Sequence, residues 1–90
     1  MLKGMPRTHR LKTWPESFVP LLIGTKAFEV RKNDRDFRAG DVLVLCEWEP
    51  DTQEYTGREE MRRCTFILQG KFGLPDDLCV MSLGKHCIET

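Results

Sequence analysis

The segment VLVLCEW, residues 42–48, constrains the fold of this chain more than any other stretch. It is apolar on both alternating faces up to Cys46, and its length is normal for a strand. A strand that is apolar on both faces must be covered on both sides. Because a chain of 90 residues can bury one core but not two, this strand predicts a small barrel or a strongly curved sheet.

Four other segments show strand patterns, with turn residues between them: residues 8–13, 26–32, 58–68 and 78–83. Residues 14–24 predict one short helix. Its signals are a proline in the first turn, three large apolar residues on one face and a terminal glycine: Pro15, Phe18, Leu21, Leu22 and Gly24. Pro20 lies inside this segment and predicts that the helix is short or kinked. We therefore expect a mainly β (α+β) fold with about five strands and one or two short helices.

The chain is expected to form a single domain with a central core region and a flexible tail at each end: residues 1–90, 8–83, 1–7 and 84–90, respectively. Strand alternation predicts which side chains form the core: Leu11, Phe28, Val30, Val42, Val44, Ile67, Leu68, Val80 and Met81. In residues 26–32, Glu29 and Arg31 then lie on the strand face opposite to Phe28 and Val30.

Several classes of protein are excluded by the composition. No apolar run approaches the ~20 residues needed to span a bilayer, and the charged N-terminus has no apolar segment of the signal-peptide kind. We therefore expect a cytoplasmic, monomeric protein without membrane contact. The four cysteines form no C-x-x-C pair and are expected to be reduced, mostly as small core residues: Cys46, Cys64, Cys79 and Cys87. Their wide spacing, with only His9 and His86 to join them, predicts no metal site, and no motif indicates a cofactor.

The net charge of zero hides an asymmetry between the two halves of the chain. Residues 1–40 carry nine Lys and Arg and four Asp and Glu, a balance of +5, whereas residues 41–90 carry five and ten, a balance of −5. If the halves occupy separate surfaces, the first half forms a positive face for a phosphate-bearing partner. If the halves interleave in space, their charges cancel.

A series of short motifs runs through residues 9–83: H-x-L-K-x-W-P from His9, G-x-K-x-F-E-x-R-K-N-D-R from Gly24, G-D at 40–41, E-W-E-P at 47–50, E-Y-T-G-R at 54–58 and I-L-Q-G-x-F-G-L-P at 67–75. Together they resemble the ASCH family of the PUA-like superfamily, and most closely a small bacterial and phage branch with no assigned function. The resemblance implies a PUA-like β-barrel with a cleft between the barrel and the early helix. It also implies that the domain binds RNA, nucleotides or modified nucleosides.

The candidate site lies in the second motif, because Lys26, Glu29 and Arg31 all match the family pattern. From the residues alone, Glu29 and Arg31 share one strand face, where a surface ion pair contributes about 0–1 kcal/mol. A nucleotide is the other interpretation, since Arg offers a planar fork to phosphate, Lys a point charge and Glu an acceptor for an exocyclic amine. The candidate ligand contacts are Lys12, Trp14, Lys26, Glu29, Arg31 and Lys32.

Two of these candidates have alternative structural roles. Trp14 either stacks on a base, which contributes about 1–3 kcal/mol, or anchors the helix to the barrel. Lys12 either contacts a second phosphate or is simply an outward residue of the first strand. Trp48 ends an apolar strand and is expected in the core.

A hydrolase acting on a modified nucleoside or on RNA is a second candidate, since some ASCH relatives are described as amidohydrolases of acetylated cytidine and others as ribonucleases. Lys26 would then be the polar catalytic group and Glu29 the proton shuttle. The amidohydrolases carry threonine where this chain has Glu29, and they use a glutamate from a later strand, for which Glu47 and Glu60 are candidates. A third candidate is a protein-interaction module with a vestigial cleft.

Overall fold

The computed structural model describes residues 5–86, in which five strands and one helix form the regular structure. In chain order the elements are β1 (Thr8–Thr13), α1 (Pro15–Ile23), β2 (Phe28–Lys32), β3 (Val42–Glu49), β4 (Glu54–Gln69) and β5 (Leu78–His86). The predicted fold class, mainly β with about five strands and a short helix, is confirmed. The helix continues through Pro20, which lies inside it.

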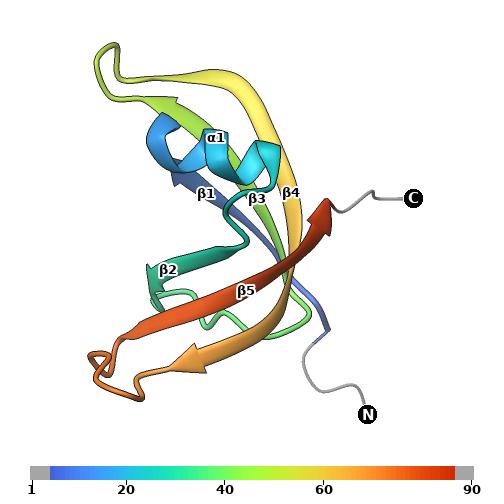
Figure 1. Cartoon of the computed structure of the whole chain (residues 1–90), viewed down its shortest axis with the longest axis vertical. Coiled ribbons are helices and arrows are strands. Elements are labelled where there is room, and N and C mark those ends of the chain that lie inside the picture. Colours follow the sequence, from blue (N-terminus) through green and yellow to red (C-terminus); the bar gives the residue numbers. More distant parts are fainter. Residues whose placement is uncertain (1–4, 87–90) are drawn as a thin grey trace.

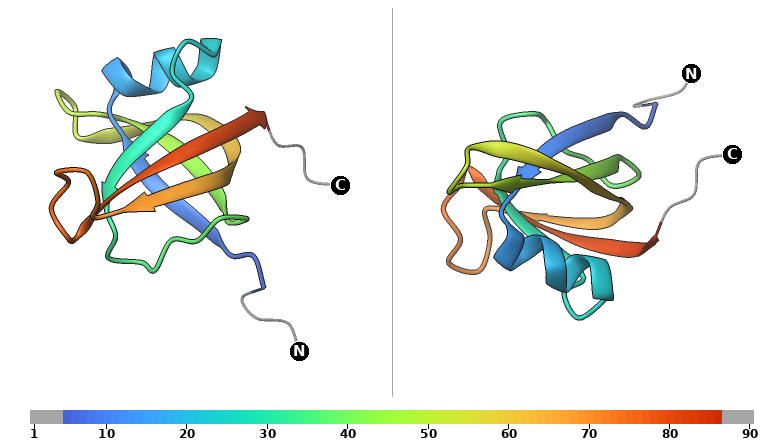
Figure 2. Two further views of the ribbon diagram at one scale, coloured as in Figure 1. Left: turned by 60° about the horizontal axis from the view of Figure 1, so that its bottom comes forward. Right: turned by 90° about the horizontal axis from the view of Figure 1, so that it is seen from above.

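All five strands belong to one sheet, in the order β1-β3-β4-β5-β2. β1 pairs in parallel with β3, whereas the β3–β4, β4–β5 and β5–β2 pairs are antiparallel. The sheet is strongly curled and forms a half-barrel (Figure 1). Helix α1 packs across one end of the curled sheet and contacts β3 (Figure 2). This curl determines where the two edge strands, β1 and β2, lie relative to each other.

β4 allows the sheet to curl, because its two halves pair with different neighbours. The first half pairs with β3 and the second with β5, and register shifts fall between Arg62 and Phe66. Such irregularities bend a strand and increase its twist. β4 begins at Glu54 and not at the predicted residue 58, because an exposed hairpin arm keeps its backbone pairing although its side chains are polar. β5 extends to residue 86, so its end was wrongly assigned to a flexible tail.

The core lies between the concave side of the half-barrel and α1. Its largest fully buried side chains come from the helix and from four strands: Leu11, Phe18, Leu21, Leu43, Leu45, Cys64, Cys79 and Met81. Among the predicted core residues of β1, β3, β4 and β5, four are buried and three are partly buried: Leu11, Val42, Val44 and Met81, then Ile67, Leu68 and Val80. Leu22 was expected on the buried helix face but is 40% exposed, so the apolar stripe of α1 is narrower than predicted.

The predicted orientation of β2 is wrong. Phe28 and Val30 are 47% and 49% exposed, whereas Glu29 is 3% exposed and faces the interior of the half-barrel. Buried and exposed side chains alternate along β2 as predicted, but the face chosen as buried because of its hydrophobic residues is the exposed one. An isolated carboxylate would not be buried in this way. Glu29 is buried because the cations of Lys26 and Arg31 neutralise it.

Two arginine side chains, one in β2 and one shortly after it, donate hydrogen bonds to β1 across the open seam of the half-barrel. Arg31 in β2 donates from Nη2 to the carbonyl oxygen of Lys12 in β1, at 3.0 Å. Arg35 donates from Nη1 to the carbonyl oxygen of Arg10, at 2.9 Å. Because these bonds come from side chains and not from a strand ladder, the seam leaves space between β1 and β2.

The N-terminal segment is fixed by a buried carboxylate before β1 begins. The amide of Arg7 donates to Oδ1 of Asp41 at 3.1 Å, and Nε2 of His9 lies 2.8 Å from Oδ2 of the same carboxylate. The ring of His9 meets that of Phe37 edge-on, at 4.7 Å between centroids. Arg7 is therefore part of the folded domain and not of the predicted flexible tail.

Three cysteines are buried as free thiols, as the sequence predicted: Cys46, Cys64 and Cys79. Burial raises the pKa of the Cys64 and Cys79 thiols, so both are protonated at neutral pH. Cys87 and the tail beyond it lie outside the described residues. Within residues 5–86, no helix has the length and apolar character needed to cross a membrane.

Candidate functional site

The end of α1 determines the position of Lys26. Gly24 ends the helix with a φ of 89°, in the left-handed region that favours glycine. The carbonyl oxygen of Pro20 accepts hydrogen bonds from three successive amides: Gly24 at 3.0 Å, Thr25 at 2.9 Å and Lys26 at 3.1 Å. These bonds wrap the chain around the helix end and turn it toward β2. The Lys26 side chain therefore starts close to the strand that carries Glu29 and Arg31.

Lys26, Glu29 and Arg31 form a compact ion triad. Nζ of Lys26 lies 3.2 Å from Oε1 of Glu29, and Nε of Arg31 lies 2.7 Å from Oε2. The Glu29 side chain is 4% exposed, whereas those of Lys26 and Arg31 are 20% and 25% exposed. A buried carboxylate thus lies beneath two cations that reach the surface, and the triad keeps one net positive charge.

Both cations of the triad keep hydrogen-bond donors for a ligand. Arg31 uses Nε on Glu29, and its Nη2 donates to the Lys12 carbonyl oxygen and to Oγ1 of Thr13, the latter at 3.3 Å. Its Nη1 has no hydrogen-bond partner within the described part of the chain. The Lys26 ammonium makes one hydrogen bond there and has three N–H donors. Because their protein contacts hold both groups in place, these donors are pre-organised for an anion.

The triad lines a pocket of about 430 Å³ at the seam between β1, β2 and the start of α1, which we call the seam pocket. All six ligand contacts predicted from the sequence line it: Lys12, Trp14, Lys26, Glu29, Arg31 and Lys32. Trp14 is 48% exposed and is therefore not a core anchor. Lys32 is exposed, and its Nζ lies 3.8 Å from Oδ2 of Asp77. The cleft expected between the early helix and the sheet is therefore present.

Four residues that the sequence analysis did not single out for the site also line the seam pocket: Thr13, Glu16, Ser17 and Val30. Glu16 and Ser17 lie in the first turn of α1, directly after Trp14. Their presence could have been predicted, because a helix that starts at a pocket brings its whole first turn there. Val30 was assigned to the core, but it is 49% exposed and borders the pocket because it lies between Glu29 and Arg31 in β2.

The glutamates considered for a hydrolase lie away from the seam pocket. Glu47 accepts two hydrogen bonds from Arg58, at 2.8 and 3.0 Å. These bonds hold the pKa of the Glu47 carboxyl below its usual value, against the opposite effect of burial. Glu60 pairs with Arg62 at 2.7 Å, and both side chains are buried. The carboxylate paired with Lys26 is Glu29.

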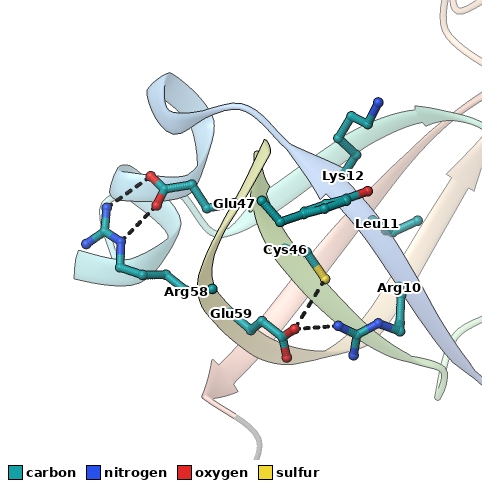
Figure 3. Close-up of a pocket in the computed structure, with 9 residues that line it drawn as sticks. Arg10, Leu11, Lys12, Cys46, Glu47, Arg58 and Glu59 are labelled. Carbon is teal, nitrogen blue, oxygen red and sulfur yellow. Dashed lines mark hydrogen bonds and ion pairs between the residues drawn. The ribbon is translucent and has the colours of Figure 1, made fainter. Parts of the chain in front are cut away.

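A second pocket, of about 330 Å³, is lined by residues of β1, β3 and β4 and is called the three-strand pocket. Figure 3 shows its two ion pairs, Arg58 with Glu47 and Arg10 with Glu59, and the Cys46 thiol beside the second pair. Sγ of Cys46 lies 3.9 Å from Oε2 of Glu59. Burial is the main cause that raises the pKa of this thiol, so it is protonated at neutral pH and a poor nucleophile.

The fold and these pockets define a small, mainly β domain whose curled sheet brings its edge strands together at a cationic pocket. Among residues 5–86, no group of three His, Cys, Asp or Glu side chains is placed to hold a metal ion. Residues 8–83 match the family described as a domain of unknown function (DUF3850). The chain therefore belongs to this family.

The chain is also similar to a phage protein, described as "Uncharacterized 12.9 kDa protein in GpA 3'region" of Escherichia phage P2. The two are 38% identical over 63 residues, which cover 70% of this chain and 56% of the phage protein. The match thus spans little more than half of the relative. Neither description names an activity.

Proposed function

We propose that the seam pocket binds the phosphate and the base of a nucleotide or of RNA, as expected of an ASCH-like domain. The observation that carries this proposal is the triad of Lys26, Glu29 and Arg31, which lines one pocket with Trp14. Cations with unused donors bind phosphate, and an exposed indole stacks on a base. The match of all three triad residues to the ASCH motif supports the same function.

The phosphate contacts the donors that the protein leaves unused. Nη1 of Arg31 and the remaining N–H groups of Lys26 form the first contacts, and Lys12 lines the same pocket. Lys12 makes no ion pair within residues 5–86, so its charge is available to a ligand. A hydrogen bond that involves a charged group contributes about 1.5–3 kcal/mol, which is enough for specific binding of a phosphate by two or three such contacts.

The base stacks on Trp14, which is half exposed and borders the pocket. The hydroxyl group of Ser17 lines the same pocket, and a hydroxyl donates to or accepts from a base edge. A pocket lined by cations, an exposed indole and a neutral hydroxyl binds a nucleoside phosphate better than it binds a bare anion. A modified nucleoside is included in the proposed ligand class.

We propose binding and not hydrolysis, because Glu29 is committed to two cations. Each of its carboxylate oxygens accepts one of their hydrogen bonds, whereas a proton shuttle must exchange a proton with the substrate. Glu47 and Glu60 pair with arginines elsewhere. Hydrolysis and a vestigial, protein-binding cleft are the alternatives that the experiment separates. We also propose a cytoplasmic monomer, and the buried free thiols support a reducing compartment.

The test is a calorimetric titration with the four common nucleoside 5′-monophosphates and the matching nucleosides, at two salt concentrations. We expect the monophosphates to bind more tightly than the nucleosides, with an affinity that falls as salt rises. Lys26→Ala and Arg31→Ala should each weaken binding about tenfold, since each removes a charged hydrogen bond. Lys71→Ala, in the exposed loop between β4 and β5, is the matched control and should bind as the wild type does.

Equal affinities of the wild type, Lys26→Ala and Arg31→Ala would show that the seam pocket is not the binding site. The same mixtures are analysed for product by chromatography, and turnover that depends on Lys26 would favour the hydrolase. If no monophosphate or nucleoside binds at millimolar concentration, the proposed function is wrong and the vestigial cleft is favoured.

A further inference from the structure

We propose that the seam pocket is one end of a longer strip that binds single-stranded nucleic acid, and that the three-strand pocket is its other end. The ligand class is then an oligonucleotide, not an isolated nucleotide. This inference rests on the proposed function, because the strip begins at the seam pocket. Three observations carry it: a lysine shared by both pockets, a row of aromatic rings between them and the excess of cations along them.

Lys12 is the side chain that the two pockets share. Its Nζ lies 4.1 Å from the centroid of the Trp48 ring, so the ammonium group is held above an aromatic face. It has no carboxylate partner within residues 5–86. A positive charge that is held in place and not neutralised, between two pockets, is where a phosphate that joins two bound nucleotides would lie.

Three aromatic rings follow one another from the first pocket to the second. Trp14 lines the seam pocket, and its ring centroid lies 6.3 Å from that of Trp48. Trp48 in β3 pairs in register with Tyr55 in β4, and Tyr55 is 58% exposed and lines the three-strand pocket. All four bases stack on aromatic side chains, so such a row of rings binds a single nucleic-acid strand with little sequence preference.

The charges that line the two pockets also favour a polyanion. Together the pockets are lined by six Lys and Arg and by four Glu side chains, which leaves a positive excess. In the three-strand pocket, Arg10 and Arg58 are paired with Glu59 and Glu47, as Figure 3 shows, so the uncompensated charge there is that of Lys12. Cations next to stacking rings form the usual pattern of single-strand binding.

The width of the strip sets the length of the ligand. Trp14 follows β1, and Tyr55 lies in β4, with β3 between these two strands. Two strand spacings amount to about 10 Å. Since stacked bases repeat about every 3.4 Å, the strip accommodates roughly three or four nucleotides.

The experiment follows the quenching of the fluorescence of Trp14 and Trp48 by adenosine 5′-monophosphate and by oligoadenylates of increasing length, as RNA and as DNA. We expect the affinity to rise about tenfold or more between the monophosphate and the tetranucleotide, and then to level off. Tyr55→Ala should remove most of this gain, and Tyr55→Phe should keep it, because stacking needs the ring and not the hydroxyl. Phe72→Ala changes an aromatic residue that is 89% exposed in the loop between β4 and β5 and lines neither pocket, and it should keep the full gain.

The outcomes separate this inference from the proposed function. If the monophosphate binds but the tetranucleotide binds no more tightly, or if Tyr55→Ala keeps the gain, the strip is disproved and the seam pocket remains a nucleotide site. If neither ligand quenches the fluorescence nor binds by calorimetry, both proposals are wrong. An affinity that rises with oligonucleotide length for RNA but not for DNA would identify RNA as the ligand.

Discussion

Glu29 is the residue on which the candidate site depends, because it is both charged and buried. Burying a carboxylate is costly unless it is paired, and here both of its oxygens accept hydrogen bonds from cations, Lys26 and Arg31. The pairing also holds the two cations in place. Glu29 is thus a positioning residue for the groups that contact the proposed phosphate, and its loss should affect the stability of the domain as well as the site.

Glu29→Gln should lower the free energy of unfolding by about 1–3 kcal/mol, because it leaves two partly buried cations without their counter-ion. This loss of stability is smaller than for a fully buried ion pair, because the Lys26 and Arg31 side chains are 20% and 25% exposed. The measurement is denaturant unfolding followed by circular dichroism. Asp36→Asn is the control, because that carboxylate is 62% exposed, and it should change stability by less than about 0.5 kcal/mol. Equal effects of the two substitutions would contradict the account of Glu29.

Acid should destabilise the domain through Asp41. Burial alone would raise the pKa of this carboxyl, but hydrogen bonds from His9 and from the amides of Arg7 and Arg38 outweigh it and lower the pKa below its usual value. A group with a lowered pKa in the folded state stabilises the fold above its unfolded pKa, about 3.9, and this contribution is lost as pH falls through the folded pKa. The free energy of unfolding should therefore decrease below about pH 4.

The pH dependence is measured by denaturant unfolding at several pH values between neutral and acid. Asp41→Asn should be less stable than the wild type at neutral pH and should show a smaller loss in acid. Asp51→Asn, in the exposed turn between β3 and β4, is the matched control and should follow the wild-type curve. If Asp41→Asn and the wild type lose the same free energy of unfolding between neutral and acid pH, other carboxylates cause the effect.

Which face of β2 is buried could not be predicted from the residues of that strand alone. The alternation of Phe28, Glu29, Val30 and Arg31 was predictable, but the choice of the buried face was not. Hydrophobicity favours burial of Phe28 and Val30, and the cost of burying Glu29 is offset by pairs that exist only after the chain has folded. The six residues predicted as ligand contacts nevertheless line one pocket, the seam pocket.

Among the elements, the ends of the helix and the central strand were predicted correctly, because their signals are local in the sequence. Pro15 and Gly24 marked the ends of α1, and the double-sided apolar run marked β3 as a strand within the sheet. The start of β4 was missed because polar side chains from Glu54 onward resemble a loop, although the hairpin pairs them with β3. The row from Trp48 to Tyr55 was also missed, since it depends on the register of this hairpin.

Gly24→Ala should cost about 1 kcal/mol, because the residue needs a φ of 89° that a β-carbon disfavours. No atom lies within 4 Å of the place where the added carbon would be, so the expected cost is conformational and not steric. Thermal unfolding measures the effect. Gly24→Asn is the control, since asparagine tolerates this conformation, and it should lose less stability than Gly24→Ala. The reverse order would show that the helix end is not held as described.

At the scale of the whole molecule, the curl of one sheet produces both the core and the seam pocket. The strands pair in the order β1-β3-β4-β5-β2, so β1 and β2 are the two edges. Arg31 in β2 and Arg35, shortly after β2, both donate hydrogen bonds to β1. The number of strands and the need for curvature followed from the sequence. The meeting of the two edges did not, because it depends on the bend within β4, where no residue type signals an irregularity.

Two valine substitutions test this architecture together. Val44→Asp should abolish cooperative unfolding, because an unpaired charge at a position that is 3% exposed costs several kcal/mol of a small total stability. Val30→Asp should leave the domain folded, since this side chain is 49% exposed in the described fold, although the sequence alone predicts it in the core. The measurement is thermal unfolding of both variants. A folded Val44→Asp or an unfolded Val30→Asp would contradict the assigned faces of β3 and β2.

The central claim, that the seam pocket binds a nucleotide phosphate, is tested most directly by NMR. Amide resonances of the labelled wild-type protein are followed while a nucleoside 5′-monophosphate is added. We expect the largest saturable shift changes in residues 12–17 and 26–32, the segments that line the pocket. We also expect much weaker changes with the matching nucleoside, which lacks the phosphate. The absence of saturable changes, or changes centred on residues 83–85 of β5, which line a separate pocket, would contradict this prediction.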